Sequence, residues 1–166
     1  MTKQLWILAG GNGAGKSTFY RHYLLPTGMP MLNVDDIARK LEPDDPGSAI
    51  TTAQHWVELK RSKMVKSGES FCYETVFSHV SKVDFVAEAK SYGYEITIIY
   101  IHLDTPELNQ ARVKQRVSEG GHDVPPDKIE TRIPRTMDHV SNAFDLADQV
   151  RLLDNSSHAE PFKKIA

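Results

Sequence analysis

A glycine-rich stretch followed by lysine and serine stands near the start of the chain. Residues 10–17 read GGNGAGKS and match the pattern G-x-x-x-x-G-K-[ST], whose backbone N–H groups, lysine and hydroxyl group hold the phosphates of a nucleotide. An apolar run precedes the match and a segment of helical character follows it, as the motif requires. The sequence therefore predicts a phosphate-binding loop between a strand and a helix.

The residue types in this loop also predict its ligands. Glycines allow the backbone to curl until its N–H groups and the N-terminus of the following helix face the β-phosphate. Lys16 would reach oxygens of the β- and γ-phosphates, and the hydroxyl of Ser17 would coordinate Mg²⁺. We expect the cofactors to be ATP and Mg²⁺, bound by Gly11, Asn12, Gly13, Ala14, Gly15, Lys16, Ser17 and Thr18.

The rest of the chain narrows what happens to the γ-phosphate. A GTPase would carry an N-K-x-D reader for guanine, which the sequence lacks, and the D-x-x-G match at 44–47 lies in a Pro-rich turn without a preceding strand. A motor ATPase would carry adjacent Asp and Glu residues at the end of a strand. Here Glu107 stands three positions after Asp104, a spacing typical of the start of a helix. A role near magnesium is the alternative for Asp104. A kinase of a small molecule remains.

Acidic residues follow two of the predicted strands, where ligands of a doubly wound sheet bind. Asp35 could accept the proton of an attacking hydroxyl and aim that hydroxyl at the γ-phosphate; alternatively, Asp35 or Asp36 only favours the start of a helix. Glu74 is costly at the end of an apolar strand unless it meets donors such as substrate hydroxyls or joins a structural ion pair. We expect Asp35, Glu74 and Thr75 to contact the acceptor.

Arginines gather around two glycines in the region 116–136, which we expect to form a lid. Arg112 and Arg116 are four residues apart on one helical face, and glycines 120 and 121 offer a hinge. Such a lid closes on the triphosphate, excludes water and spreads the charge of the transition state. Arginines exposed on solvated helices are the alternative. We expect Arg116 to act in catalysis and Arg112 to contact the substrate.

The segment after the hinge carries two more arginines, Arg132 and Arg135. They belong to a further predicted helix that would complete the lid, and we expect Arg132 to act in catalysis. Pro134 between them is expected to bend or end this helix, because proline removes a backbone hydrogen bond.

Short apolar runs that alternate with helical segments must position these residues. The runs expected to be buried parallel strands are 5–9, 31–34, 71–73, 96–103 and 150–153. The helices are expected at 48–67, 78–94 and 104–121, and from 125 onward. The third would be capped by Asp104 or Thr105, and the fourth by a capping box of Asp127 and Glu130.

This order predicts an α/β fold of the P-loop NTPase and kinase type. A mostly parallel sheet would be covered by helices on both faces, with a helical lid in addition. We expect one P-loop kinase domain over residues 1–166, because a chain of this length buries one core.

The composition excludes several classes of protein. The 166 residues, 40% hydrophobic and 25% charged, are typical of a globular protein. A formal net charge of −2 gives no basic excess for nucleic acid. Cys72 is the single cysteine, no apolar run reaches the roughly 18 residues of a membrane span, and no signal peptide is evident. We expect a cytoplasmic protein with a buried Cys72 that binds neither nucleic acid nor membrane.

Five segments in compact order resemble the zeta toxin family, and more closely its smaller bacterial branch. They are GGNGAGKST, NVDDIA, YETVFS, RVSEGGHDVP and RIPRT. The resemblance covers nearly the whole chain, from about Lys3 to Ser156. It implies a P-loop kinase that uses ATP to phosphorylate a sugar hydroxyl of UDP-N-acetylglucosamine, a nucleotide sugar.

The resemblance also implies roles for individual residues. It places the loop lysine on Lys16, the catalytic carboxylate on Asp35, the substrate-contacting pair on Glu74 and Thr75, and the clamp of the γ-phosphate on Arg116.

A second clamp and a partner complete what the family implies. The place of the second clamp is taken by His122, with Arg132 or Arg135 as the alternatives. A protein antitoxin is a partner in this family that the residues themselves do not indicate. Two other functions stay open, namely a kinase of another small metabolite, such as a sugar acid or nucleoside, and a nucleotide-dependent switch with slow ATPase activity.

Overall fold

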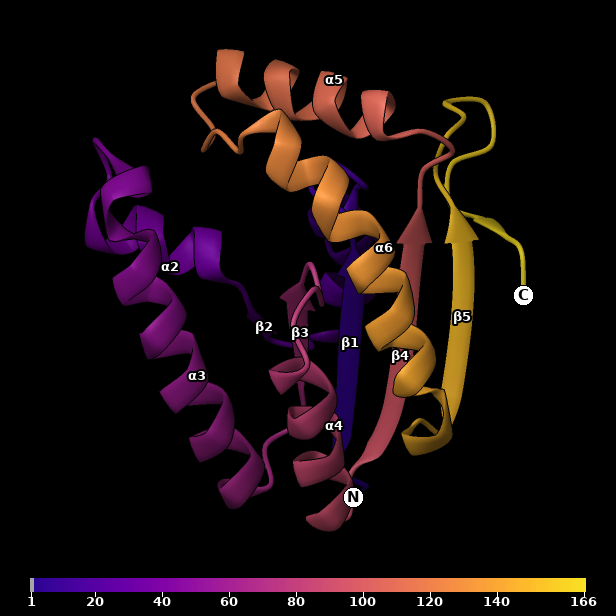
Figure 1. Ribbon diagram of the computed structural model, residues 1–166. Helices are drawn as coiled ribbons and strands as arrows, with labels where there is room; N and C mark the ends of the chain where they lie inside the picture. The colour runs from indigo at the N-terminus through magenta and orange to yellow at the C-terminus, as the bar shows by residue number, and fades with distance from the viewer. Residues whose placement is uncertain (1) are drawn as a thin grey trace.

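One mixed sheet forms the centre of the molecule (Figure 1). The computed structural model describes residues 2–166, and within them the strand order is β2-β3-β1-β4-β5-β6. The first five strands are parallel, and β6 pairs antiparallel with β5. The strands are β1 (Gln4–Gly10), β2 (Met31–Leu32), β3 (Phe71–Thr75), β4 (Glu95–His102), β5 (Gln149–Asp154) and β6 (Lys163–Lys164).

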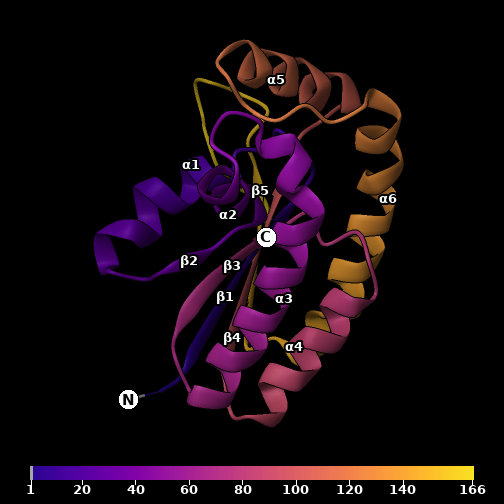
Figure 2. The same cartoon turned by 90° about the vertical axis from the view of Figure 1, so that its left-hand side faces the viewer.

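Helices cover both faces of the sheet, as predicted. Figure 2 shows α3, α4 and α6 on one side of the sheet and α1 on the other. In Figure 1, α5 lies across the ends to which the strand arrows point. The helices are α1 (Lys16–Phe19), α2 (Val34–Leu41), α3 (Ile50–Ser67), α4 (Ser81–Ser91), α5 (Pro106–Ser118) and α6 (Pro126–Asn142).

Each predicted apolar run contains a strand, but the second strand is shorter than expected. The run 31–34 yields a strand of only two residues, Met31–Leu32. Asn33 ends it because its side chain caps α2, accepting a hydrogen bond from the backbone N–H of Asp36 at 3.2 Å. Strand β6 was not predicted, since a two-residue pairing of lysines has no apolar pattern.

Two expectations about helix ends are corrected. Thr105 caps α5 through a hydrogen bond from the N–H of Leu108, but α6 begins after Pro125 without a side-chain cap, so the predicted box of Asp127 and Glu130 is wrong. The helix also does not end at Pro134 but continues to Asn142. Pro134 is exposed to water, and buried residues on both sides of it hold α6 in place: Ile129 packs against Val113 of α5, and Val140 packs in the larger core cluster.

The core consists of two main clusters, one on each face of the sheet. The cluster beneath α3, α4 and α6 is the larger, and its strand residues include Leu5, Ile7, Ile96 and Ile98, all fully buried. Cys72 is fully buried in the second cluster, as expected. The carboxyl ends of β1 and β3 are thereby fixed side by side.

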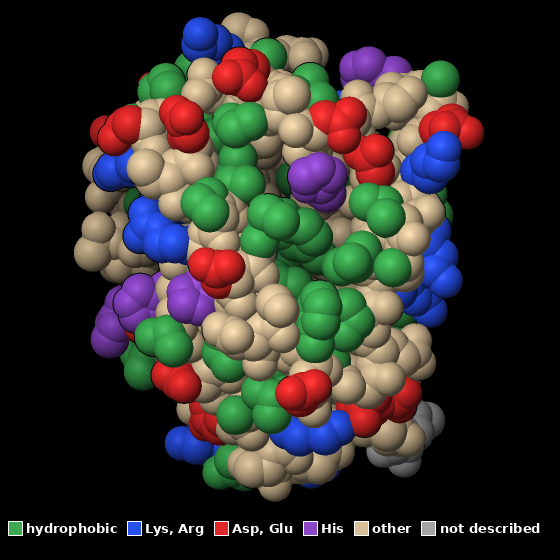
Figure 3. Space-filling view, turned by 45° about the vertical axis from the view of Figure 1, so that its right-hand side comes forward, with side chains coloured by type: hydrophobic (Ala, Val, Ile, Leu, Met, Phe, Trp, Pro, Cys, Tyr) green, Lys and Arg blue, Asp and Glu red, His purple; other side chains and the backbone are tan. Residues whose placement is uncertain are grey.

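The surface shows mixed charge. On the face in Figure 3, acidic and basic side chains are interspersed with apolar ones. Within residues 2–166, no helix combines the length and apolar character needed to cross a bilayer.

The central strand β4 offers a test of this packing. Ile98 is fully buried and lies between Ile7 of β1 and Val150 of β5. Replacing it by alanine should lower the free energy of unfolding by about 2–5 kcal/mol, because an isoleucine truncation leaves a cavity. Urea unfolding measures this loss. Val80→Ala is the control, since Val80 is 52% exposed; an equal loss in both variants would contradict the assigned core.

Candidate active site

The predicted phosphate loop lies between β1 and α1, as its motif requires. Gly13 and Gly15 have φ angles of 79° and 101°, in the left-handed region that favours glycine. A side chain at Gly13 would meet the backbone oxygen of Asn109 at 2.7 Å. On the other side, the Asn155 amide donates a hydrogen bond to the carbonyl of Ala14 at 2.9 Å. The loop is therefore fixed between α5 and the segment after β5.

Lys16 is buried at the mouth of this loop. Its Nζ donates hydrogen bonds to the carbonyl oxygens of Gly10 (2.9 Å) and Gly11 (3.0 Å). Burial lowers the pKa of Lys16, an effect opposed by the nearby negative charges of Glu74 and Asp35. The ammonium group is thus held where the motif places phosphate oxygens.

Glu74, at the end of β3, accepts two hydrogen bonds from neighbouring elements. One comes from the Ser17 hydroxyl at 2.9 Å and the other from the Asn33 amide. Burial raises the pKa of Glu74, although Lys16 and both hydrogen bonds oppose the rise. A hydroxyl and a carboxylate side by side are suitable oxygen donors for Mg²⁺, which takes one or two protein ligands together with phosphates and water.

Asp35 lies in the first turn of α2 and faces Arg116 of α5. The two side chains are half-buried, and Arg116 Nη1 lies 3.8 Å from Asp35 Oδ2. Asn33 caps α2, and Asp36 forms an ion pair with Arg39 at 3.2 Å. Asp35 is therefore not needed to start the helix, and it lines the cavity opposite Arg116.

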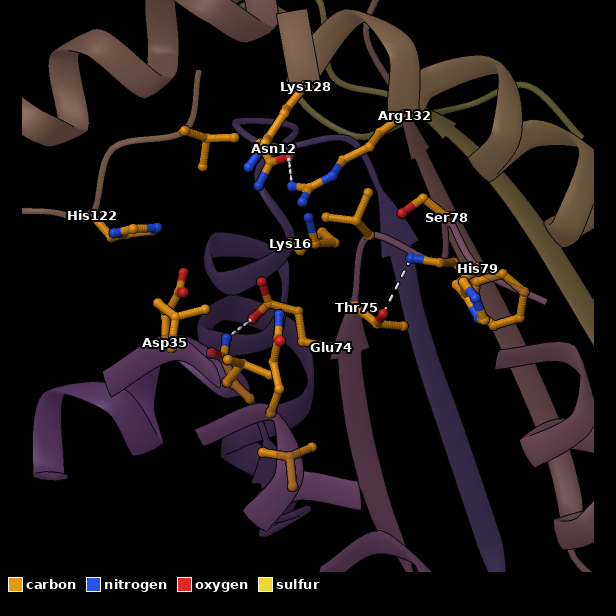
Figure 4. Close-up of a pocket in the computed structure, with 18 of the residues that line it drawn as sticks. Asn12, Lys16, Asp35, Glu74, Thr75, Ser78, His79, His122, Lys128 and Arg132 are labelled. Carbon is orange, nitrogen blue, oxygen red and sulfur yellow. Dashed lines mark hydrogen bonds between the residues drawn. The ribbon is translucent and has the colours of Figure 1, made fainter. Parts of the chain in front are cut away.

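A cavity of about 790 Å³ brings the predicted residues together. Its size is in the range of small-molecule sites. Figure 4 shows Lys16 between Arg132 and Glu74, with Asp35 and His122 to one side. The candidate catalytic and acceptor residues that line it are Lys16, Asp35, Glu74, Thr75, Arg116, His122 and Arg132.

Two arginines lie outside this cavity. Arg112 Nη2 donates a hydrogen bond to the carbonyl of Asn155 at 2.8 Å, beside the phosphate loop, so this geometry does not support its predicted substrate contact. Arg135 is exposed and donates to the carbonyl of Thr131 within α6. Of the alternatives for the second clamp, His122 and Arg132 line the cavity and Arg135 does not.

The first half of α5 and the lid region both contact the phosphate loop through Asn12. The Asn109 amide of α5 donates to the Asn12 carbonyl at 2.8 Å, and Arg132 of α6 lies 3.5 Å from Asn12 Oδ1. Sequence reasoning missed Lys128, which lines the same cavity. Its spacing of four residues from Arg132 was a usable signal, because residues so spaced share one helical face.

Glycines between the lid helices position Arg116. The N–H of Gly121 donates to the carbonyl of Arg116 at 2.9 Å, and a methyl group at Gly121 would lie 2.8 Å from that oxygen. Arg116 Nη2 in turn donates to the carbonyl of His122 at 3.1 Å. The predicted hinge is therefore a tight turn that holds the arginine.

Thr75 has a structural contact as well as a place in the cavity. Its hydroxyl accepts a hydrogen bond from the N–H of Phe77 at 3.1 Å. Phe77 is fully buried and has a φ of 63°, which is unusual for a residue other than glycine. The turn that follows β3 is thus fixed so that Ser78 and His79 line the cavity (Figure 4).

Comparison with known proteins agrees with this architecture. The model of a family described as an AAA domain matches residues 5–135. The chain belongs to this family. An uncharacterized protein of Haemophilus influenzae is 29% identical over 137 residues, which span 78% of this chain and 97% of that protein.

Solved structures share the fold at low sequence identity. A structure from the PezAT chromosomal toxin-antitoxin system of Streptococcus pneumoniae is 14% identical with a TM-score of 0.74, over 99% of this chain and 72% of that chain. A complex of AvrRxo1-ORF1 and -ORF2 with ATP is 16% identical with a TM-score of 0.73, over 93% of this chain and 55% of that chain. A gluconokinase from Sinorhizobium meliloti is 16% identical with a TM-score of 0.58, over 96% of this chain and 85% of that chain. The P-loop kinase fold and the resemblance to a toxin fold are thus confirmed.

The raised pKa of Glu74 predicts a pH dependence of stability. A raised pKa means that folding favours the protonated carboxyl, so this contribution is present at low pH and is lost as the pH rises through the pKa of the folded state. Glu74→Gln should therefore raise the melting temperature relative to wild type, and the difference should grow between about pH 4 and pH 8. Circular dichroism without nucleotide measures it, with Glu130→Gln on the exposed side of α6 as control. A difference that shrinks as the pH rises would contradict the burial of this carboxylate.

Proposed function

We propose that this protein is an ATP-dependent kinase that transfers the γ-phosphate to a hydroxyl of a nucleotide sugar, with UDP-N-acetylglucosamine as the acceptor. One observation carries the proposal: Asp35 of α2 and Arg116 of α5 approach to 3.8 Å across a cavity that also contains Lys16. A base for the acceptor, a clamp for the transferred group and a phosphate-binding lysine are the parts that phosphoryl transfer requires.

We assign residues 11–18 to the nucleotide. Backbone N–H groups of the loop bind the phosphates, and Lys16 exchanges its carbonyl partners for β- and γ-phosphate oxygens. Arg112, beside the loop, contacts the nucleotide in this proposal and not the acceptor. Because Ser17 already donates to Glu74, we place Glu74 with Ser17 at the magnesium ion. When bound, Mg²⁺ offsets the charge that develops on the phosphates.

Asp35 and Thr75 contact the acceptor in this proposal. The acceptor hydroxyl gives its proton to the Asp35 carboxylate as its oxygen forms a bond to the γ-phosphorus. The bond between that phosphorus and the β–γ bridging oxygen breaks, and ADP leaves. Thr75 marks the end of β3 on the acceptor side of the cavity.

The lid supplies positive charge above the transferred group. Arg116 and Arg132 neutralise the γ-phosphate oxygens, helped by Lys128, and His122 closes the side of the cavity next to Asp35 (Figure 4). Fixed donors in a site that excludes water stabilise the transition state more than water does. The lid also keeps water from competing with the acceptor.

The fold similarity suggests a partner and a second substrate class. Likeness to a toxin-antitoxin protein supports a protein antitoxin as a partner, and use of ATP suits the cytoplasm. Likeness to a gluconokinase supports a sugar acid as the alternative acceptor.

The assigned roles predict how variants behave with UDP-N-acetylglucosamine. Asp35→Asn should lower kcat by about 10²–10⁴, the usual contribution of a general base. Arg116→Ala should lower it by about 10³ or more, as expected for a charge clamp. Lys16→Ala should give no detectable product, and all three variants should keep the wild-type circular dichroism spectrum.

Mass spectrometry of the acceptor measures these rates. If the wild-type protein phosphorylates gluconate and leaves UDP-N-acetylglucosamine unchanged, the assigned acceptor is wrong and the assigned kinase activity stands. Wild-type rates in Asp35→Asn would overturn the assigned base.

A further inference from the structure

The cavity extends beyond the reacting groups into the space between α3 and α4. This far end is not used by the steps proposed above. Figure 2 shows the two helices side by side on one face of the sheet. The residues that line the far end are Gln54, Val57 and Glu58 of α3, Ser81 and Lys82 of α4, and Tyr73 of β3.

A buried arginine without a carboxylate partner lies at this end. Arg61 of α3 is only 8% exposed, and its guanidinium carbon lies 4.5 Å from the ring centre of Phe85 and 5.3 Å from that of Tyr73. Among residues 2–166, no acidic side chain lies within 4 Å of it. Burial of a cation away from acidic side chains costs free energy unless another group interacts with the charge.

Arg61 directs the Tyr73 hydroxyl as a donor. Arg61 Nη1 donates to the Tyr73 hydroxyl oxygen at 3.1 Å, so the hydroxyl hydrogen of Tyr73 remains for an oxygen in the cavity. Tyr73 is only 2% exposed, and it is one of the residues that line the cavity, so it borders the place where an acceptor molecule would be bound.

Lys82 adds a second positive charge to the same place. Its Nζ lies 5.8 Å from the ring centre of Tyr73, and it has no acidic partner within 4 Å among the residues of the described range. Lys82 is in the first turn of α4, where the helix dipole also favours a negative charge. Glu58 lines this end too and contributes a negative charge, but it forms no ion pair with Lys82 or Arg61 within 4 Å.

We propose that the far end of the cavity binds an anionic group of the acceptor, contacted by Tyr73 and Lys82, with Arg61 as the residue that positions Tyr73. This inference rests on the proposed kinase function. Tyr73 precedes Thr75 by two residues in β3, a separation of about 7 Å along a strand. The anionic group would therefore be bound beside the part of the acceptor that contacts Thr75.

Two pairs of acceptors, each with one anionic and one neutral member, test the proposal. They are UDP-N-acetylglucosamine with N-acetylglucosamine, and gluconate with glucose, each incubated with ATP and Mg²⁺. Wild-type protein should phosphorylate the charged member at least about tenfold more efficiently in kcat/KM, a discrimination of about 1.4 kcal/mol. The pair that responds distinguishes a diphosphate from a carboxylate as the anion.

Variants locate the effect at the far end. Lys82→Ala and Tyr73→Phe should each raise KM for the charged acceptor about tenfold, leave kcat within about threefold, and leave KM for ATP unchanged. Lys63→Ala, at an exposed position of α3 outside the cavity, is the matched control. Arg61→Met should raise the same KM but add little to Tyr73→Phe, because a positioning residue acts through its partner.

The outcomes separate this inference from the kinase proposal. If charged and neutral members are phosphorylated equally and Lys82→Ala leaves KM unchanged, the proposed anion site is wrong and the proposed kinase activity stands. If none of the four compounds is phosphorylated, calorimetric titration of UDP-N-acetylglucosamine and of gluconate into protein with a non-hydrolysable ATP analogue decides. Binding of either compound that weakens about tenfold in Lys82→Ala would support the anion site. Absence of binding, or binding equal in both proteins, would overturn it.

Discussion

The Glu74 carboxylate holds together the parts on which the rest of the site depends. It lies at the end of a central strand and accepts hydrogen bonds from Ser17 in the phosphate loop and from Asn33. Asn33 also caps α2 through the N–H of Asp36, and this cap sets the first turn, where Asp35 lies. This one half-buried acid therefore fixes the nucleotide side of the site relative to the acceptor side. Its desolvation is partly offset by Lys16.

A second set of contacts relates the lid to this framework. Asn12 of the loop accepts hydrogen bonds from Asn109 of α5 and from Arg132 of α6. Both helices are therefore positioned by the predicted phosphate loop. The turn at Gly121 then sets the direction of Arg116. Movement of the lid therefore changes the position of the positive charges relative to the γ-phosphate, which is how a lid can couple closure to chemistry.

Features that depend on local pattern were predictable, and features that depend on contacts between distant residues were not. The phosphate loop and the strands follow from spacing and apolar runs, so Lys16 and Ser17 could be placed from the sequence. The position of Arg112 could not, because its partner Asn155 lies 43 residues away in the chain. The error at Asp127 arose because a capping-box spacing also occurs inside a helix that begins with prolines. The pairing of Arg61 with Tyr73 left no local pattern, because it joins a helix to a strand across 12 positions of the chain.

The meeting of Asp35, Arg116 and Lys16 in one cavity supports transfer of the γ-phosphate to a small molecule. The most direct measurement is a mass-spectrometric scan of a cytoplasmic metabolite extract incubated with the protein, Mg²⁺ and ATP labelled with ¹⁸O in its γ-phosphate. We expect a metabolite to gain one labelled phosphoryl group with wild-type protein and not with Lys16→Ala. Release of the label only as inorganic phosphate, with no labelled metabolite, would contradict this expectation and favour a nucleotide-dependent switch.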